Sequence, residues 1–202
     1  MPTASRRNSS AHVRQKQQKR RAEILHAALS AFREHGFHAT SLDDIAVRLG
    51  IRKTALYHYF ADKDALLFEC HRESLAELER IIEASAVCCA GPVERLAYLI
   101  REHVRIMTET LEGSPLAFEV PALSPKRRAQ IVAGRDRYEQ LLRELVSAGI
   151  DSGAFRDVDP KVVVFAMLGS INWIARWYRP EGSMKSDALG RQFADYLIGG
   201  LQ

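Results

Sequence analysis

The 202-residue sequence predicts an all-α protein with two helical domains. Apolar residues recur at helical spacing along most of the chain, and no stretch shows the strict alternation that is typical of a half-buried strand. Glycine and proline residues separate the helical stretches. We predict a disordered basic arm over residues 1–19, a three-helix unit with a helix-turn-helix over residues 20–67, and a larger helical domain over residues 68–202.

The positive charge of the chain is concentrated in its N-terminal third. Residues 1–70 hold 12 Lys or Arg and 7 Asp or Glu, a net charge of +5, while the whole chain carries +4. No acidic residue precedes Glu23. Such a cationic arm suits a phosphate backbone, although a solvated disordered tail has the same composition.

The sequence also indicates the cellular compartment of the protein and the state of its cysteines. The nearest approach to a membrane span, residues 162–175, is too short and is flanked by Lys161 and Arg176. No apolar signal segment is visible, so we expect a cytoplasmic protein without a membrane partner. The three cysteines at 70, 88 and 89 lack metal-ligand spacing and predict reduced thiols, with a redox sensor on the vicinal pair as the alternative.

The first helical stretch runs from Arg20 to His35 and ends at Gly36, where a left-handed residue suits a helix C-terminus. The second is short. Ser41 is its expected cap, Asp44 is the capping-box partner, and one apolar face is marked by Leu42, Ile45, Ala46 and Leu49. These signals predict two helices joined by a tight turn.

A third helix is predicted from about Lys53 to Phe60, after a turn that contains Gly50. Two short helices joined in this way are a helix-turn-helix. At 100° per residue Leu56 and Phe60 face inward, while polar side chains face outward for phosphates or base edges. Asp62 is predicted to cap a fourth helix whose first turn, with Lys63, favours an anion. The alternative is a small helical cluster with solvated polar residues.

The segment "ILHAALSAFREHGFHATSLDDIAVRLGIRKTALYHYFADKDALL" resembles the DNA-binding domain of the TetR family of bacterial transcriptional regulators over about residues 20–67. The elements G-F, T-S-x-x-x-I-A, L-G-I, L-Y-H-Y-F and K-x-x-L occur in the family's order and spacing. Family members often carry other residues at the positions of Arg52, Thr54 and Ala55, so the operator sequence cannot be transferred. The resemblance and the outward face together predict a DNA-contacting set of Ser41, Arg52, Lys53, Thr54, Tyr57, His58 and Lys63.

The remaining two-thirds of the sequence also predicts helices. Gly91-Pro92 precedes a helix that runs to Leu111, and three prolines at 115, 121 and 125 break the next stretch. A long helix then ends at Gly149, Asp159-Pro160 opens a helix to about Tyr178, and a last helix follows the turn at 179–182. The TetR resemblance implies that this part binds a ligand and that its last two helices form a dimer interface.

Basic and aromatic residues in this second part predict an anionic ligand with an apolar tail. Arg135 lies on an apolar stripe, and Asn172, Arg176 and Arg179 share a helix face near two tryptophans. The alternative is that the tryptophans are core or dimer interface, that the arginines reach into solvent, and that His103 is a core residue. The predicted ligand-contacting set is His103, Met107, Arg135, Tyr138, Asn172, Trp173, Arg176, Trp177 and Arg179.

The segments "GIDSGAFRDVD", "GSINWIARWYRPEG" and "FADYLIGGL" are similar to TetR regulators that sense acyl-coenzyme A thioesters in lipid or steroid degradation. We therefore expect a homodimeric repressor that binds a palindromic double-stranded DNA operator and is released by an acyl-CoA. The alternatives are a TetR regulator of a free hydrophobic molecule, a protein that coats DNA without sequence specificity, and a protein-interaction module. No catalytic motif, cofactor motif or metal-ligand spacing is found, so we expect no enzyme.

Overall fold

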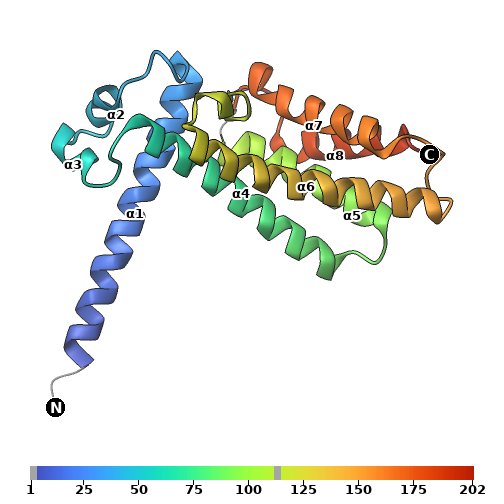
Figure 1. The fold of residues 1–202 in the computed structure, drawn as a ribbon, viewed down its shortest axis with the longest axis horizontal. Helices are drawn as coiled ribbons and strands as arrows, with labels where there is room; N and C mark the ends of the chain where they lie inside the picture. Colours follow the sequence, from blue (N-terminus) through green and yellow to red (C-terminus); the bar gives the residue numbers. More distant parts are fainter. Residues whose placement is uncertain (1–3, 112–114) are drawn as a thin grey trace.

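The structure, a computed structural model, describes residues 4–111 and 115–202. It is all-α, as predicted, and no strand occurs among these residues. Figure 1 shows α2 and α3 at one end of the molecule and the C-terminus at the other. The elements are α1 (Ala4–His35), α2 (Leu42–Arg48), α3 (Lys53–Tyr57), α4 (Lys63–Cys88), α5 (Pro92–Arg105), a π-helical segment η1 (Ile106–Thr110), two 3₁₀ turns η2 (Pro115–Phe118) and η3 (Val120–Ala122), α6 (Pro125–Asp151), α7 (Pro160–Trp177) and α8 (Ser186–Gly199).

The N-terminal domain packs α1, α2, α3 and the start of α4 around one apolar centre. Its most deeply buried side chains are Ile24, Phe32, Ile45, Leu56 and Leu66. The predicted capping box is confirmed, because the Ser41 hydroxyl accepts from the Asp44 N–H at 3.1 Å and the Asp44 carboxylate accepts from the Ser41 N–H at 2.7 Å. Gly50 has a φ of 62°, so this turn favours glycine.

Helix α3 ends at Tyr57, three residues earlier than predicted. The Tyr59 N–H donates to the Leu56 carbonyl at 2.9 Å, a tight closure that ends the regular helix. The tightened turn still buries Phe60, which is 2% exposed, and leads into Asp62, which caps α4 through the Ala65 N–H at 2.5 Å.

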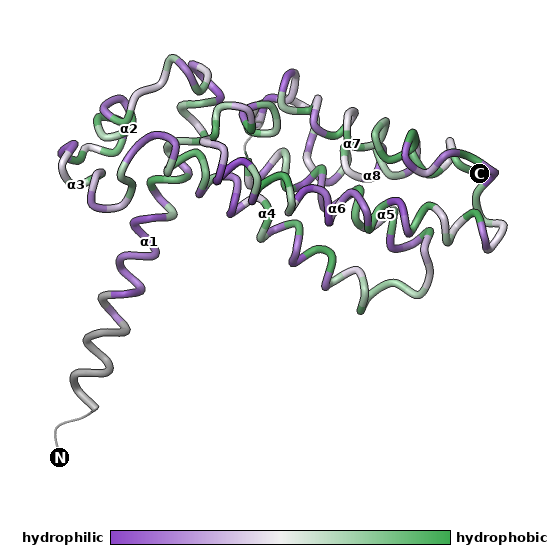
Figure 2. Tube along the Cα trace, in the orientation of Figure 1, coloured by the Kyte–Doolittle hydropathy of each residue, from purple (hydrophilic) through white to green (hydrophobic). Residues whose placement is uncertain are grey.

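The N-terminal arm differs from the prediction. We expected disorder over residues 1–19 and a helix from about Arg20, whereas α1 begins at Ala4; residues 1–3 lie outside the described part. The segment between Ala4 and His35 contains no glycine or proline, and its Arg, Lys, Gln and Ala residues favour helix. Figure 2 shows that the described part of this extension is hydrophilic, and residues 14–19 are exposed.

The larger domain is a bundle in which α5 packs against α4, α6 and α8 and α6 packs against α7. The predicted boundary at 67/68 falls inside α4, which is continuous from one domain into the other. The helix expected to run to Leu111 changes to π geometry at Ile106. There the Thr108 hydroxyl binds the Val104 carbonyl at 2.9 Å and the Ser186 hydroxyl at 2.7 Å, which disturbs the regular ladder. None of the described helices is long and apolar enough to span a membrane.

A tight contact at the end of α6 generates a stability prediction. A Cβ at Gly149 would lie 2.1 Å from the Phe155 ring, which folds back over the helix end. We expect Gly149→Ala to lower the free energy of unfolding by about 1–3 kcal/mol through overpacking. The control Gly199→Ala, where the added methyl group meets no atom within 4 Å, should change it by less than about 0.5 kcal/mol. Chemical denaturation measures both, and equal effects would contradict the packing argument.

Candidate DNA-binding surface and ligand cavity

Helix α3 presents one buried and one exposed face, as the sequence predicted. Leu56 is fully buried, whereas Lys53, Thr54 and His58 are exposed and Tyr57 is 44% exposed. Arg52 lies at the start of α3 with an exposed side chain that caps no N–H group. The helix therefore displays basic, hydroxyl and imidazole groups to the exterior.

Lys53 is held by neighbouring side chains on this surface. Its Nζ donates to the Asp43 carboxylate at 2.8 Å and lies 5.8 Å from the centre of the Tyr57 ring. The hydrogen bond to Asp43 raises the pKa of Lys53 above its usual value. A DNA phosphate would therefore compete with an exposed carboxylate for this lysine.

Besides Lys53, two further predicted contacts already have partners within the domain. Ser41 uses its hydroxyl in the capping box. Lys63 does not point into open solvent, because its Nζ donates to the carbonyls of Thr40 at 2.7 Å and His38 at 3.2 Å and lies 4.2 Å from the Phe37 ring centre. Burial lowers the pKa of Lys63. In this geometry Lys63 ties the start of α4 to the turn between α1 and α2.

The basic extension of α1 lies beside α3. A surface groove is lined on the α1 side by Arg14, Gln17, Gln18 and Arg21 and on the other side by Ala55, His58 and Tyr59. The structure thus places cationic and amide side chains of the predicted arm next to the exposed face of α3, which extends the positive surface.

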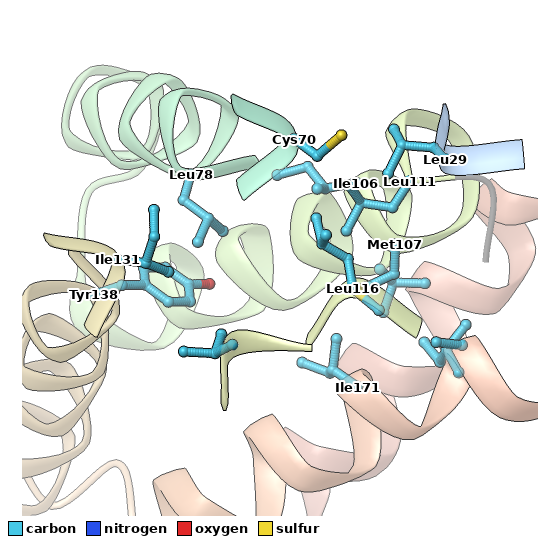
Figure 3. Close-up of a cluster of buried hydrophobic side chains, with 14 of the residues drawn as sticks. Leu29, Cys70, Leu78, Ile106, Met107, Leu111, Leu116, Ile131, Tyr138 and Ile171 are labelled. Carbon is cyan, nitrogen blue, oxygen red and sulfur yellow. The ribbon is translucent and has the colours of Figure 1, made fainter. Parts of the chain in front are cut away.

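A cavity of about 80 Å³ lies inside the larger domain. Figure 3 shows Leu78 of α4, Met107 of η1, Leu116 of η2 and Tyr138 of α6 around this interior. The structure brings together five of the nine predicted ligand contacts here. The lining residues are His71, Ser74, Leu75, Leu78, His103, Met107, Leu111, Leu116, Ala117, Arg135, Tyr138, Leu168 and Asn172.

Sequence reasoning missed the contribution of α4 to this cavity. His71, Leu75 and Leu78 are spaced i, i+4 and i+7 and so share a helix face, which was visible in the sequence. That spacing is also typical of an ordinary core stripe. What distinguishes it is the placement of Arg135 from α6 in the same cavity, which no local pattern indicates.

The polar groups of the cavity are poorly satisfied by the protein. Arg135 donates to the Ala117 carbonyl at 3.0 Å, and no acidic residue in the described part of the chain forms an ion pair with it. His71 and His103 are 1% and 7% exposed, and the Nε2 of His71 and the Nδ1 of His103 have no hydrogen-bond partner. Burial lowers the pKa of His71 to about 3 and that of His103 to about 4, and nearby Arg135 acts in the same direction.

The other predicted ligand contacts lie outside this cavity. Trp173 is 57% exposed and Trp177 is 40% exposed. The Arg176 guanidinium lies 4.8 Å from the Phe118 ring centre, and the rings of Phe118 and Trp173 meet edge to face at 6.3 Å. Arg179 is exposed and donates to the Tyr178 carbonyl. We call Phe118, Trp173 and Arg176 the surface cluster.

Comparison with known proteins decides the family. The model of the N-terminal domain of bacterial regulatory proteins of the tetR family matches residues 24–70, and that of the tetracyclin repressor-like C-terminal domain matches residues 89–201, more than half of the chain. The chain belongs to the TetR family of transcriptional regulators. It is therefore a DNA-binding regulator rather than an enzyme.

Relatives within the TetR family match nearly the full length of the chain. The repressor KstR2 of Rhodococcus jostii is 32% identical over 193 residues, covering 90% of this chain and 91% of that protein. The structure of the ketosteroid regulator KstR2 of Mycobacterium tuberculosis has a TM-score of 0.83 at 29% identity, covering 91% and 95% of the two chains. The structure of AibR with isovaleryl coenzyme A and operator DNA has a TM-score of 0.76 at 30% identity, covering 90% and 97%.

The larger domain of this TetR regulator contains the vicinal cysteines Cys88 and Cys89. The sulfur atoms of Cys88 and Cys89 lie 2.8 Å apart, and burial raises the pKa of Cys89 to about 11. This shift disfavours the thiolate form of Cys89, and the redox-sensor alternative for the pair stays a prediction. Within the described residues no group of histidine, cysteine or acidic side chains could hold a metal ion.

The two cavity histidines generate a pH prediction. Unfolded histidines bind protons below about pH 6.5, whereas the folded protein keeps His71 and His103 neutral down to about pH 4. The free energy of unfolding should therefore fall by roughly 1 kcal/mol per histidine as the pH drops from 6.5 to 5.5.

Denaturation titrations at several pH values measure this fall. His71→Gln and His103→Gln should each flatten the dependence, and His12→Gln at an exposed position should not. The same dependence in all three variants would show that these rings do not account for it.

Proposed function

We infer that the protein is a ligand-responsive repressor that binds a palindromic operator as a homodimer and is released by an acyl-CoA. One observation carries the ligand part. Ala117 and Asn172 line the buried cavity, while the next residues along the chain, Phe118 and Trp173, belong to the exposed surface cluster. A buried site and an exposed basic-aromatic site therefore adjoin at η2 and α7.

This pairing suits a thioester of coenzyme A. The acyl group would occupy the cavity, and the nucleotide part would stay on the surface, where a guanidinium can bind phosphate and an indole ring can stack. The resemblance to AibR, whose structure contains isovaleryl coenzyme A, supports this class of effector. The small cavity favours a short acyl group, because a steroid ring system needs more room than about 80 Å³.

The dimer is proposed from the exposed apolar side chains of α7 and α8. Val162 is 63% exposed, Phe165 is 50% exposed and Tyr196 is 82% exposed. Large apolar groups that are exposed to solvent indicate a protein interface. Two such protomers would present two α3 helices to half-sites about 34–36 Å apart, which is one turn of DNA.

Contacts near η2 connect the cavity to the DNA-binding domain. The 3₁₀ turn η2 packs against both α1 and α7. Just beyond it, the Glu119 carboxylate lies 3.8 Å from the His38 ring, the Ser124 N–H donates to the Asp64 carboxylate at 3.0 Å, and Arg127 pairs with Asp64 at 2.5 Å. A ligand that moves η2 would therefore act on the contacts that join this segment to the DNA-binding domain.

A regulator of a free hydrophobic molecule is the second candidate. The lining of the cavity favours it, because this lining does not include Arg176 or Arg179. Such an effector would fill the apolar part alone and would leave the surface cluster without a role. The two candidates differ in whether the coenzyme is needed. In either case the protein acts on DNA, so we expect a cytoplasmic location.

The DNA-binding surface can be tested with two substitutions that should change operator affinity in opposite directions. Lys53→Gln should weaken operator binding and reduce the slope of log affinity against log salt by about 0.9 per protomer, since one phosphate contact is lost. Asp43→Asn should strengthen binding severalfold because it releases Lys53 from its carboxylate partner.

Fluorescence anisotropy with labelled promoter DNA at several salt concentrations gives both values. A scrambled duplex of equal length separates an operator-specific regulator from a protein that coats DNA. If Lys53→Gln keeps the wild-type slope, Lys53 does not contact phosphate.

The effector can be tested on the same DNA complex. Isovaleryl-CoA and valeryl-CoA should release the operator, whereas the matching free acids and coenzyme A alone should not. Arg176→Gln should weaken the response to the thioesters at least about tenfold, since a charge-assisted phosphate contact is lost, without changing DNA affinity.

Arg191→Gln is the matched control for this experiment. Arg191 is also an exposed arginine, but it pairs with Asp187 on α8, away from the surface cluster. Its response should equal that of the wild type. Equal release by thioester and free acid would favour the free hydrophobic effector instead.

A further inference from the structure

The cavity contains a polar end, formed by Arg135, His71 and His103, whose hydrogen-bonding groups the protein satisfies only in part. Arg135 has its single hydrogen bond to a backbone carbonyl, and no carboxylate of the described residues neutralises it. Two almost fully buried imidazoles, His71 and His103, each leave one ring nitrogen unpartnered. A buried polar atom without a partner destabilises a fold by about 1–3 kcal/mol, so two such ring nitrogens beside a guanidinium without an ion-pair partner indicate a bound partner.

The remaining lining is mostly apolar, and its other polar members are Ser74, Tyr138 and Asn172. Leu75, Leu78, Met107, Leu116 and Leu168 contribute only hydrocarbon or thioether surface. The free space of about 80 Å³ corresponds to about three water-sized groups, which is the size of a carboxylate with one further carbon. The cavity thus fits a compact chain with a small polar terminus.

The positive charge at the polar end of the cavity decides which chemical group of a ligand can bind there. A guanidinium donates two parallel hydrogen bonds to a carboxylate, and neutral imidazoles can donate or accept beside it. An uncharged methyl end would leave the charge of Arg135 without a counter-ion and both ring nitrogens without partners. A ketone or hydroxyl would not neutralise the guanidinium.

We propose that Arg135, His71 and His103 bind a carboxylate at the far end of the effector's acyl chain. The effector is then a short dicarboxylic acid, either as its monothioester with coenzyme A or as the free acid. This inference rests on the proposed role of the cavity as the effector site. It assigns Arg135 to the acyl end, whereas Arg176 and Arg179 are left for the coenzyme.

Matched pairs of ligands test the proposal without any mutation. Isothermal titration calorimetry of the full-length protein at pH 7.5 compares succinyl-CoA with butyryl-CoA and glutaryl-CoA with valeryl-CoA, in which a carboxylate replaces a methyl end. Each dicarboxylic thioester should bind at least about tenfold more tightly than its partner, because only it pairs with Arg135. Equal or tighter binding of butyryl-CoA and valeryl-CoA overturns the proposal and leaves the acyl-CoA repressor intact.

Free succinate and glutarate distinguish the two sources of the carboxylate. If they bind as tightly as the thioesters, the carboxylate site stands and the coenzyme A effector fails. If no dicarboxylate binds in either form, the carboxylate site fails.

Variants then assign the preference to the proposed residues. Arg135→Gln should abolish the preference for glutaryl-CoA and leave valeryl-CoA binding within about twofold. Arg135→Lys keeps the charge and should retain part of the preference, which shows that a loss in Arg135→Gln is not general unfolding. Arg176→Gln should weaken all four thioesters alike and preserve the preference. A preference that survives Arg135→Gln overturns the assignment.

Discussion

Helix α4 runs without interruption from Lys63 to Cys88, and both functional regions depend on it. Its first turn holds the DNA-binding domain, because Asp62 caps it and Lys63 binds the carbonyls of Thr40 and His38. Two turns further on, His71 faces the cavity. A continuous hydrogen-bonded helix transmits rotation and translation along its length far better than a loop does. The position of the DNA-binding domain therefore depends on how α4 packs in the larger domain.

The second link between the regions is the segment that contains η2 and η3. This segment contains Pro115 and Pro121, forms short 3₁₀ turns instead of a long helix, and contacts helices of both domains. Its carbonyl at Ala117 is the sole hydrogen-bond acceptor that the described protein offers to Arg135, and Glu119 and Ser124 meet side chains of the DNA-binding domain. Short irregular turns of this kind move at lower cost than α-helices, because fewer backbone hydrogen bonds must change together.

Local signals explain what the sequence could predict. The capping box of Ser41, the turn at Gly50 and the inward pair Leu56 and Phe60 depend on residues within a few positions, and the structure confirms each of them. Such local signals do not predict contacts between residues that are far apart in the sequence. The partners of Lys63 lie 23 and 25 residues away, and the cavity joins α4, α5, η1, η2, α6 and α7, so neither can be read from one helix. Trp173 is exposed because Val164, Met167, Ile171 and Ile174 take the buried face of α7.

An effector changes DNA binding only to the extent that it binds two conformations with different affinity. With the proposed carboxylate site, such a difference would arise where an oxygen of the ligand takes the Arg135 Nη1 donor from the Ala117 carbonyl. In that case η2 would lose its hydrogen bond to Arg135, and its packing against α1 could change. A coupling of about 3 kcal/mol suffices for a change of more than a hundredfold in operator affinity. The loss of one charge-assisted hydrogen bond, at about 1.5–3 kcal/mol, is of that size. The repressor can therefore respond to its effector without a large rearrangement of the bundle.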